Sequence, residues 1–225
     1  MTTAIIVQAR MGSTRLPGKV LLPLGAPSPR SVLGSVITRL YDTTRYGDVN
    51  EIVVAIPYDS PNELYDEAGR YGATVVTGPE DDVLERYRIA ADTVGADTII
   101  RVTADCPLID PTLLMLQLKH YELTRQFTTT PPDCPDGLGV EVFPVTDLWD
   151  AANMATDLYD REHVTPWIHK RYGTEWVSTS DRRWSLNTQE DYERIQTIYK
   201  WLPQGRRGYS WIETMRAEDH YVAGE

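Results

Sequence analysis

Four short apolar segments alternate with helical patterns over the first half of the chain. Each apolar segment has the length and β-branched content of a buried strand, as in Ala4-Ile5-Ile6-Val7. The predicted strands are residues 4 to 7, 51 to 56, 73 to 77 and 97 to 103, and the predicted helices are residues 31 to 41, 61 to 71, 82 to 94 and 110 to 125. Strands that alternate with helices in this way build βαβ units, so the order predicts an α/β fold with a mainly parallel sheet. Ligands bind such sheets beyond the carboxyl ends of the strands.

Local signals mark several element ends. Residues 60 to 63 match a capping box with Pro61 at the first helical position, and Gly72 and Gly95 each end a predicted helix. The pattern changes at about residue 131, where prolines punctuate the chain. From there the sequence predicts a strand at 139 to 143, helices at 146 to 155, 162 to 172 and 188 to 201, extended segments at 175 to 179 and 183 to 186, and a polar, partly ordered tail at 203 to 225.

Length and composition describe one α/β domain. The chain has 225 residues, of which 41% are hydrophobic and 24% charged, and no apolar run approaches the roughly 20 residues that a membrane span needs. The formal net charge of −11 argues against non-specific binding of nucleic acid, which requires a basic face. Two cysteines, Cys106 and Cys134, form neither a disulfide framework nor a zinc site, which favours a cytoplasmic protein.

A basic, glycine-containing loop follows the first predicted strand. Arg10, Arg15 and Lys19 are spread through a loop that also holds Gly12 and Gly18. Successive backbone N–H groups in such a loop form an anion-binding concavity, and arginine and lysine side chains complete a site for phosphate. Residues 1 to 41 contain no acid, although 33 acids in 225 residues would place about six there. The alternative is a surface loop with ordinary solvated cations.

This loop carries a resemblance to a known family. Residues 8 to 19, QARMGSTRLPGK, resemble the signature of the CTP-dependent cytidylyltransferases that activate acidic sugars, which include the CMP-Kdo and CMP-sialic acid synthetases. The likeness is strongest to the branch associated with spore-coat polysaccharide synthesis. The loop differs from a Walker loop, because Val20 follows Lys19 where that motif has Ser or Thr.

The resemblance implies a three-layer α/β/α, Rossmann-like nucleotidyltransferase fold with a small inserted subdomain at about 131 to 180. That subdomain would build the acceptor site and the contact of a homodimer. The implied reaction transfers CMP from CTP to an acidic acceptor, a sugar acid or a phosphonate, with Mg²⁺ as cofactor and pyrophosphate as product. The implied nucleotide-binding residues are Ala9, Arg10, Met11, Gly12, Ser13, Arg15 and Lys19, and the implied catalytic residues are Arg10, Lys19 and Asp105.

Asp105 lies where the fourth predicted strand ends. A carboxylate at that edge, opposite a basic loop, is placed to hold a triphosphate-bound Mg²⁺. Its surroundings resemble the family segment whose aspartate binds the metal, although Asp105 could equally be a turn residue or cap a short helix opening at Pro107. The family's second metal aspartate corresponds here to Asn187, which adds no charge and puts a two-carboxylate site in doubt. Asp191 is expected to be N-terminal helix charge.

Three further segments resemble the spore-coat branch: residues 78 to 87, 136 to 143 and 160 to 166. The resemblance suggests a nucleotide contact for Arg86, with a plain capped surface helix as the alternative. It suggests acceptor contacts for Glu141, Arg161 and His163, with helix-start electrostatics and subunit packing as the alternative. Two rival functions remain at this stage. A glycosyltransferase would have an Asp-x-Asp motif, which residues 105 to 107 lack, and Asn187 leaves open a non-catalytic nucleotide-binding module.

Overall fold

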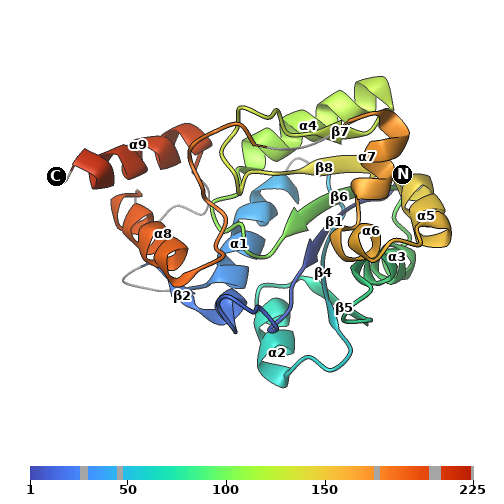
Figure 1. Ribbon diagram of the computed structural model, residues 1–225, viewed down its shortest axis with the longest axis horizontal. Coiled ribbons are helices and arrows are strands. Elements are labelled where there is room, and N and C mark those ends of the chain that lie inside the picture. Colours follow the sequence, from blue (N-terminus) through green and yellow to red (C-terminus); the bar gives the residue numbers. More distant parts are fainter. Residues whose placement is uncertain (26–29, 45–47, 175–177, 203–208, 224–225) are drawn as a thin grey trace.

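A six-stranded mixed sheet lies at the centre of the computed structural model, which describes residues 1–25, 30–44, 48–174, 178–202 and 209–223 (Figure 1). The strand order is β5-β4-β1-β6-β8-β7. Strands β5, β4, β1 and β6 run parallel, and β8 lies antiparallel between β6 and β7. The strands are β1 (Thr3–Gln8), β4 (Glu51–Pro57), β5 (Thr74–Gly78), β6 (Thr98–Thr103), β7 (Thr128–Thr129) and β8 (Glu141–Pro144); β2 (Pro23–Leu24) and β3 (Arg30–Ser31) form a separate pair.

Helices cover both faces of this sheet. Along β1 the side chains alternate, so that Ile5 and Val7 pack on one face and Ala4 and Ile6 on the other. The first face is covered by α1 (Val32–Thr44), α2 (Asn62–Arg70) and α4 (Pro111–Thr124), and the second by α3 (Val83–Val94) and α5 (Val145–Met154). The predicted three-layer α/β/α fold is therefore confirmed. Among the described residues, no helix is both long and apolar enough to cross a lipid bilayer.

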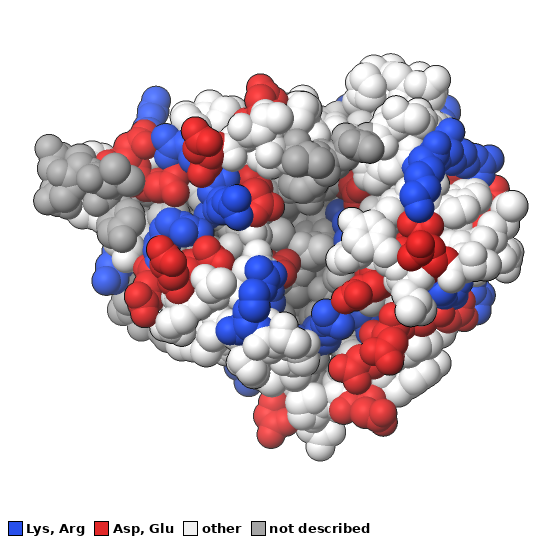
Figure 2. All heavy atoms as spheres, in the orientation of Figure 1, with Lys and Arg blue, Asp and Glu red and all other residues white. Residues whose placement is uncertain are grey.

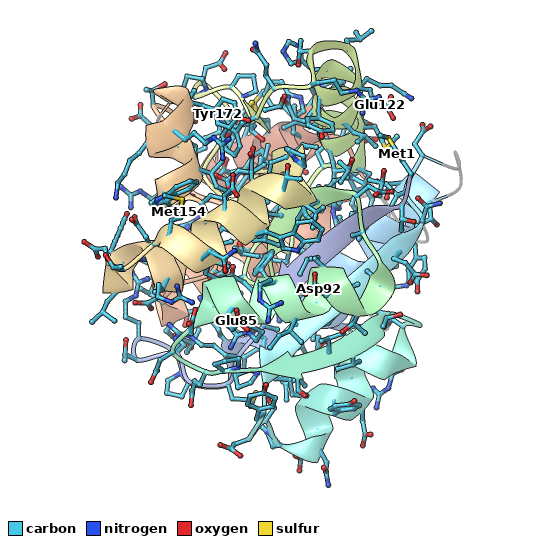
Figure 3. All side chains as sticks on the ribbon, turned by 90° about the vertical axis from the view of Figure 1, so that its right-hand side faces the viewer. Met1, Glu85, Asp92, Glu122, Met154 and Tyr172 are labelled. Atoms are coloured by element: carbon cyan, nitrogen blue, oxygen red, sulfur yellow. The ribbon has the colours of Figure 1, made fainter. Side chains whose placement is uncertain are left out.

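The described part of the segment from 131 to 180 contributes a strand to the main sheet. Its strand β8 pairs with β6, and Phe143 of β8 packs into the second core face. Helix α5 then crosses over α3, as Figure 3 shows with Met154 at the end of α5 above Glu85 and Asp92 of α3. Trp149 of α5 donates from Nε1 to Asp92 at 2.9 Å. A role of this segment in dimerisation stays a prediction.

Two helix boundaries differ from the sequence prediction. Helix α2 has Pro61 at its N-cap with no side-chain cap, so the predicted capping box does not form. The helix predicted over 162 to 172 is two helices, α6 (Leu158–His163) and α7 (Pro166–Tyr172). They separate at Val164, whose φ of 73° is incompatible with a continuous helix. The extended segment predicted at 175 to 179 lies partly outside the described residues.

The end of the chain is more ordered than its polar composition indicates. Trp211–Ala223 form helix α9, which packs beside α8 (Gln189–Trp201) (Figure 1). The tail expected to be partly ordered thus contains a helix that its polar composition does not indicate. Glu218 explains the difference, because this acid is buried and accepts hydrogen bonds from Arg182 and from Trp184 Nε1. A charge that the sequence alone assigns to solvent is paired in the fold.

Candidate active site

A cavity of about 570 Å³ opens at the carboxyl ends of β1 and β6. Its walls come from the loop after β1, the start of α3, the loop after β6, the segment before and into β8, the end of α6 and the segment before α8. Side chains of both charge signs surround the hollow in the middle of the face seen in Figure 2. The cavity therefore lies at the sheet edge where ligands bind α/β proteins.

The loop after β1 is held by its own backbone. Met11 O accepts from both Ser13 N at 2.9 Å and Gly18 N at 3.0 Å, and Gly18 adopts a φ of 70° that favours glycine. Five of the seven predicted nucleotide-binding residues of this loop line the cavity: Ala9, Arg10, Ser13, Arg15 and Lys19. Met11 and Gly12 do not; Met11 closes the turn through its carbonyl. Thr14 lines the cavity as well.

Lys19 joins this loop to Asp105. Helix η1 (Lys19–Leu21) begins directly at this lysine, and its ammonium donates to Asp105 Oδ2 at 2.7 Å and to Leu186 O at 2.7 Å. The side chain is nearly buried, with 11% of its surface exposed. The structure thus brings the basic loop and the carboxylate after β6 to one place, although 86 residues separate them in sequence.

Asn187 also belongs to this cluster. Its Oδ1 accepts from Arg15 Nη2 at 3.0 Å and from Lys19 Nζ at 3.3 Å. Its Nδ2 donates to Ser185 Oγ at 3.0 Å, and Ser185 in turn donates to Asp136 Oδ2 at 2.6 Å. Ser185 and Asp136 line the cavity. The sequence does not predict that these residues belong to the site, because nothing in their local pattern indicates contact with Asn187. Asp191 lies in the first turn of α8, as predicted, and its carboxylate accepts from Thr188 N at 2.9 Å.

The oxygen donors at this end of the cavity fit Mg²⁺. Among the described residues, no group of three His, Cys, Asp or Glu side chains could hold a metal by itself. Mg²⁺ is usually bound through one or two protein oxygens together with phosphates and water, and Asp105 and Asn187 Oδ1 supply that number. Burial raises the pKa of the neighbouring Cys106 thiol, which keeps it protonated and removes it as a soft metal ligand.

Two arginines, the buried Arg86 and the half-buried Arg101, line another part of the cavity wall. The Arg86 side chain, only 1% exposed, donates to Pro79 O at 2.7 Å, and burial lowers its pKa. Arg101 pairs with Glu141 at 2.7 Å. Within the described ranges, Arg86 Nε, Arg101 Nε and Gln8 Oε1 are all buried without a hydrogen-bond partner. Buried polar atoms are rarely left unpaired, so this wall is suited to a polar ligand.

The three predicted acceptor residues have different surroundings. Glu141 lines the cavity, but its carboxylate already accepts from Arg101, Thr165 and His169. Burial alone would raise the Glu141 pKa, yet Arg101 and His169 outweigh it and lower the net value. His163 lines the cavity, with its ring centroid 4.3 Å from that of Tyr159.

Arg161 is not brought to the cavity lining. Its guanidinium donates to Asp82 Oδ2 at 2.7 Å and to the carbonyls of Ala152 and Ala155. It therefore joins α6 to the N-cap of α3 and to the end of α5, which accounts for this arginine without an acceptor. This geometry favours the helix-electrostatics alternative for Arg161.

Comparison with known proteins gives the family. The cytidylyltransferase family model matches residues 4–224. The spore coat polysaccharide biosynthesis protein SpsF of Bacillus subtilis is 32% identical over 209 residues, which are 87% of this chain and 85% of that protein. A cytidylyltransferase structure from Leptospira borgpetersenii superposes with a TM-score of 0.87 at 27% identity, covering 99% of this chain and 96% of that one.

A third comparison concerns the fold alone. The CMP:2-keto-3-deoxy-manno-octonic acid synthetase in complex with CTP superposes with a TM-score of 0.66 at 16% identity, covering 89% of this chain and 99% of that one.

The family match itself rules out the glycosyltransferase and the non-catalytic module as interpretations of the sequence. The chain belongs to the cytidylyltransferase family and is a CTP-dependent nucleotidyltransferase that transfers CMP.

Proposed function

We propose that this enzyme transfers CMP from CTP to an acidic acceptor, a sugar acid or a phosphonate, and releases pyrophosphate in a Mg²⁺-dependent reaction. The observation that carries the proposal is the cluster in which Arg15 and Lys19 meet Asp105 and Asn187 in the cavity, whose lining also includes Arg10. Three cations and a backbone loop suit the β- and γ-phosphates, and a carboxylate beside them suits a bound metal.

The protein's part in this reaction is positioning and charge neutralisation. In-line displacement at the α-phosphorus needs the pyrophosphate leaving group held still, and the loop after β1 is braced for this by the two bonds to Met11 O. Arg15 supplies net positive charge, because its partner in the cluster is the neutral amide of Asn187. Arg10 contributes less, since it is shared with Glu162 at 3.3 Å.

Asp105 and Asn187 would hold the magnesium ion. The chemistry that Mg²⁺ supplies in such sites is neutralisation of the phosphate charge as the leaving group departs. Lys19 donates to both of these residues and so keeps their oxygens turned toward the triphosphate end of the cavity. An anionic acceptor brings its own nucleophilic oxygen, so the proposal requires no general base.

The acceptor is proposed to bind near His163, and Arg86 is proposed to contact the nucleotide. Arg86 offers an Nε that has no partner among the described residues, and His163 is exposed at the rim. Beside this rim, three large apolar side chains of α5 and α6 are exposed: Met154 at 64%, Leu158 at 83% and Tyr159 at 60%. Exposed apolar groups of this size support a homodimer contact next to the acceptor site.

Pyrophosphate release tests this proposal. The enzyme would be incubated with CTP, Mg²⁺ and a panel of acidic sugars and phosphonates, and pyrophosphate would be measured with each acceptor. With the acceptor that reacts, Asp105→Ala is expected to lower kcat at least 100-fold, because the loss of a preorganised charged group in an active site costs about 10²–10³ in rate. Asp133→Ala, at an exposed acid away from the cavity, serves as the matched control.

Unchanged turnover in the Asp105 variant would refute the metal assignment. Absence of pyrophosphate with every acidic acceptor, together with release in the presence of a neutral one, would refute the acceptor class.

A further inference from the structure

We propose that Asp136 is a positioning residue of this active site: through Ser185 it fixes which end of the Asn187 side-chain amide faces the cations of the phosphate loop. This inference rests on the proposed function in one respect, that Arg15, Lys19 and Asn187 face the triphosphate. It concerns a carboxylate that acts on these cations only through Ser185 and Asn187, and it explains how a neutral residue can serve in a cationic cluster.

The polarity of the hydrogen-bond chain carries the argument. A hydroxyl has a single hydrogen to donate. A carboxylate can only accept, so Ser185 must give its hydrogen to Asp136 Oδ2 at 2.6 Å. The Ser185 oxygen is then left as an acceptor, and at 3.0 Å it can be satisfied by the NH₂ end of Asn187 but not by the oxygen end. Asp136 thus determines that Asn187 turns its oxygen away from Ser185.

That oxygen lies between two cations. Asn187 Oδ1 accepts from Arg15 Nη2 at 3.0 Å and from Lys19 Nζ at 3.3 Å. The reversed amide would place its N–H hydrogens against a guanidinium and an ammonium, which cannot accept hydrogen bonds. It would also remove the amide oxygen proposed to face Mg²⁺. The orientation of the Asn187 amide therefore decides whether its oxygen accepts from Arg15 and Lys19 or its NH₂ group repels them.

The backbone holds the relay in place. Trp184 N donates to Asp136 O at 2.6 Å, and Asp136 N donates to Arg182 O at 3.1 Å. These two backbone hydrogen bonds hold residue 136 beside the segment from 182 to 185. Gly137 has a φ of 97°, and a Cβ there would lie 2.5 Å from the carbonyl carbon of Trp184. A residue with a side chain at 137 would force the two segments apart.

A double-mutant cycle between positions 136 and 187 tests the inference. Asp136→Ala removes the acceptor of the Ser185 hydroxyl, which frees its hydrogen to point at Asn187 and allows the amide to reverse. Combining Asp136→Ala with Asn187→Asp restores a consistent chain, because Ser185 can then donate to the introduced carboxylate at position 187. A purely structural role of Asp136 would not be rescued by a change at position 187.

The readout is the affinity for CTP, and separately for inorganic triphosphate, measured by calorimetry with EDTA present. Loss of an orienting partner behind a binding residue costs about 10- to 100-fold, so Asp136→Ala is expected to weaken both ligands at least tenfold. In the Asn187→Asp background the same substitution is expected to change affinity less than about threefold. Melting curves of all variants check folding, and Ser185→Ala with and without Asn187→Asp provides the same comparison should Asp136→Ala not fold.

Equal losses in both backgrounds would overturn the inference, and so would an Asp136→Ala variant that binds like wild type. Pyrophosphate release is not measured in this assay. Failure of the proposed reaction and failure of the relay therefore appear in different experiments.

Discussion

At the scale of single residues, Lys19 links the loop after β1 to two other segments that line the cavity. It donates to a carboxylate, a backbone carbonyl and an amide that come from two other segments of the chain. The sequence predicted Lys19 and Asp105, because a cation in a glycine loop and an acid at a strand end leave local patterns. It could not predict Leu186 O or the pair Ser185 and Asp136, since a contact between distant loops leaves no periodicity to read.

Replacement of Lys19 by methionine should weaken CTP binding by about 10- to 100-fold. The variant keeps most of the side-chain volume but loses hydrogen bonds from a charged group, each worth about 1.5–3 kcal/mol. Calorimetric titration with CTP would measure the loss. Lys119→Met is the control, because Lys119 is an exposed lysine paired with Asp48 and Glu122 on the surface. Equal affinities in the Lys19 variant and wild type would contradict the proposed phosphate contact.

At the scale of elements, Arg161 joins three helices. It leaves α6, pairs with the N-cap residue Asp82 of α3 and donates to carbonyls at the end of α5. Asp82 also accepts from Glu85 N at 3.0 Å, so one carboxylate both caps α3 and anchors α6. Val83 and Arg86 of α3 line the cavity, so this contact holds α6 against the start of a helix that forms part of the cavity wall.

Arg161→Met should lower the free energy of unfolding by about 2–3 kcal/mol, because it leaves Asp82 and two carbonyls without a partly buried charged donor. Urea denaturation would measure the difference. Arg88→Met on the exposed side of α3 loses only i,i+3 and i,i+4 pairs, worth about 0.3–0.5 kcal/mol each, and is the matched control. Should Arg161→Met instead leave stability unchanged and raise the KM of the acceptor, the original assignment to acceptor binding would be right.

The elements themselves were predictable where their signals are local. The capping residue Thr188 and the stop at Gly95 fix α8 and α3, and both boundaries agree with the sequence. The break between α6 and α7 was not predictable, because a positive φ at the β-branched Val164 follows from packing rather than from preference. Helix α9 was missed because its buried acid, Glu218, is paired with Arg182, which lies in the distant segment before α8.

At the scale of the whole molecule, the cavity is lined by side chains of both charge signs, although the chain as a whole is strongly acidic. Five of the cavity-lining side chains are Lys or Arg, although the chain carries a net charge of −11. The acid-free first 41 residues supply three of these cations, which is the part that the sequence revealed. Glu141, which also lines the cavity, links β6, β8 and α7 through its contacts with Arg101, Thr165 and His169.

This network makes part of the stability dependent on pH. The folded-state pKa of Glu141 lies below its ordinary value, so its contribution is complete above the unfolded pKa of about 4.3 and is lost as pH falls through the lower folded pKa. Glu141→Gln should cost about 3 kcal/mol at pH 7, because it leaves Arg101 buried without its counter-charge. The difference from wild type should shrink below about pH 4.

Chemical denaturation between about pH 3 and pH 7 would follow the two curves across the unfolded pKa. Glu122→Gln, in a surface pair with Lys119, should run parallel to wild type over the same range. A gap between wild type and Glu141→Gln that stayed constant with pH would show that the network does not titrate as its contacts imply.

The contact from Lys19 to Leu186 spans 167 residues, and it has a consequence for synthesis of the enzyme. The signature loop is synthesised well before its partners, so its lysine meets no carbonyl at 186 and no amide at 187 until those residues have also emerged from the ribosome. A nascent chain that has passed only position 150 carries the motif without the rest of the CTP site. The nucleotide can stabilise this fold only after residues 186 and 187 have been synthesised.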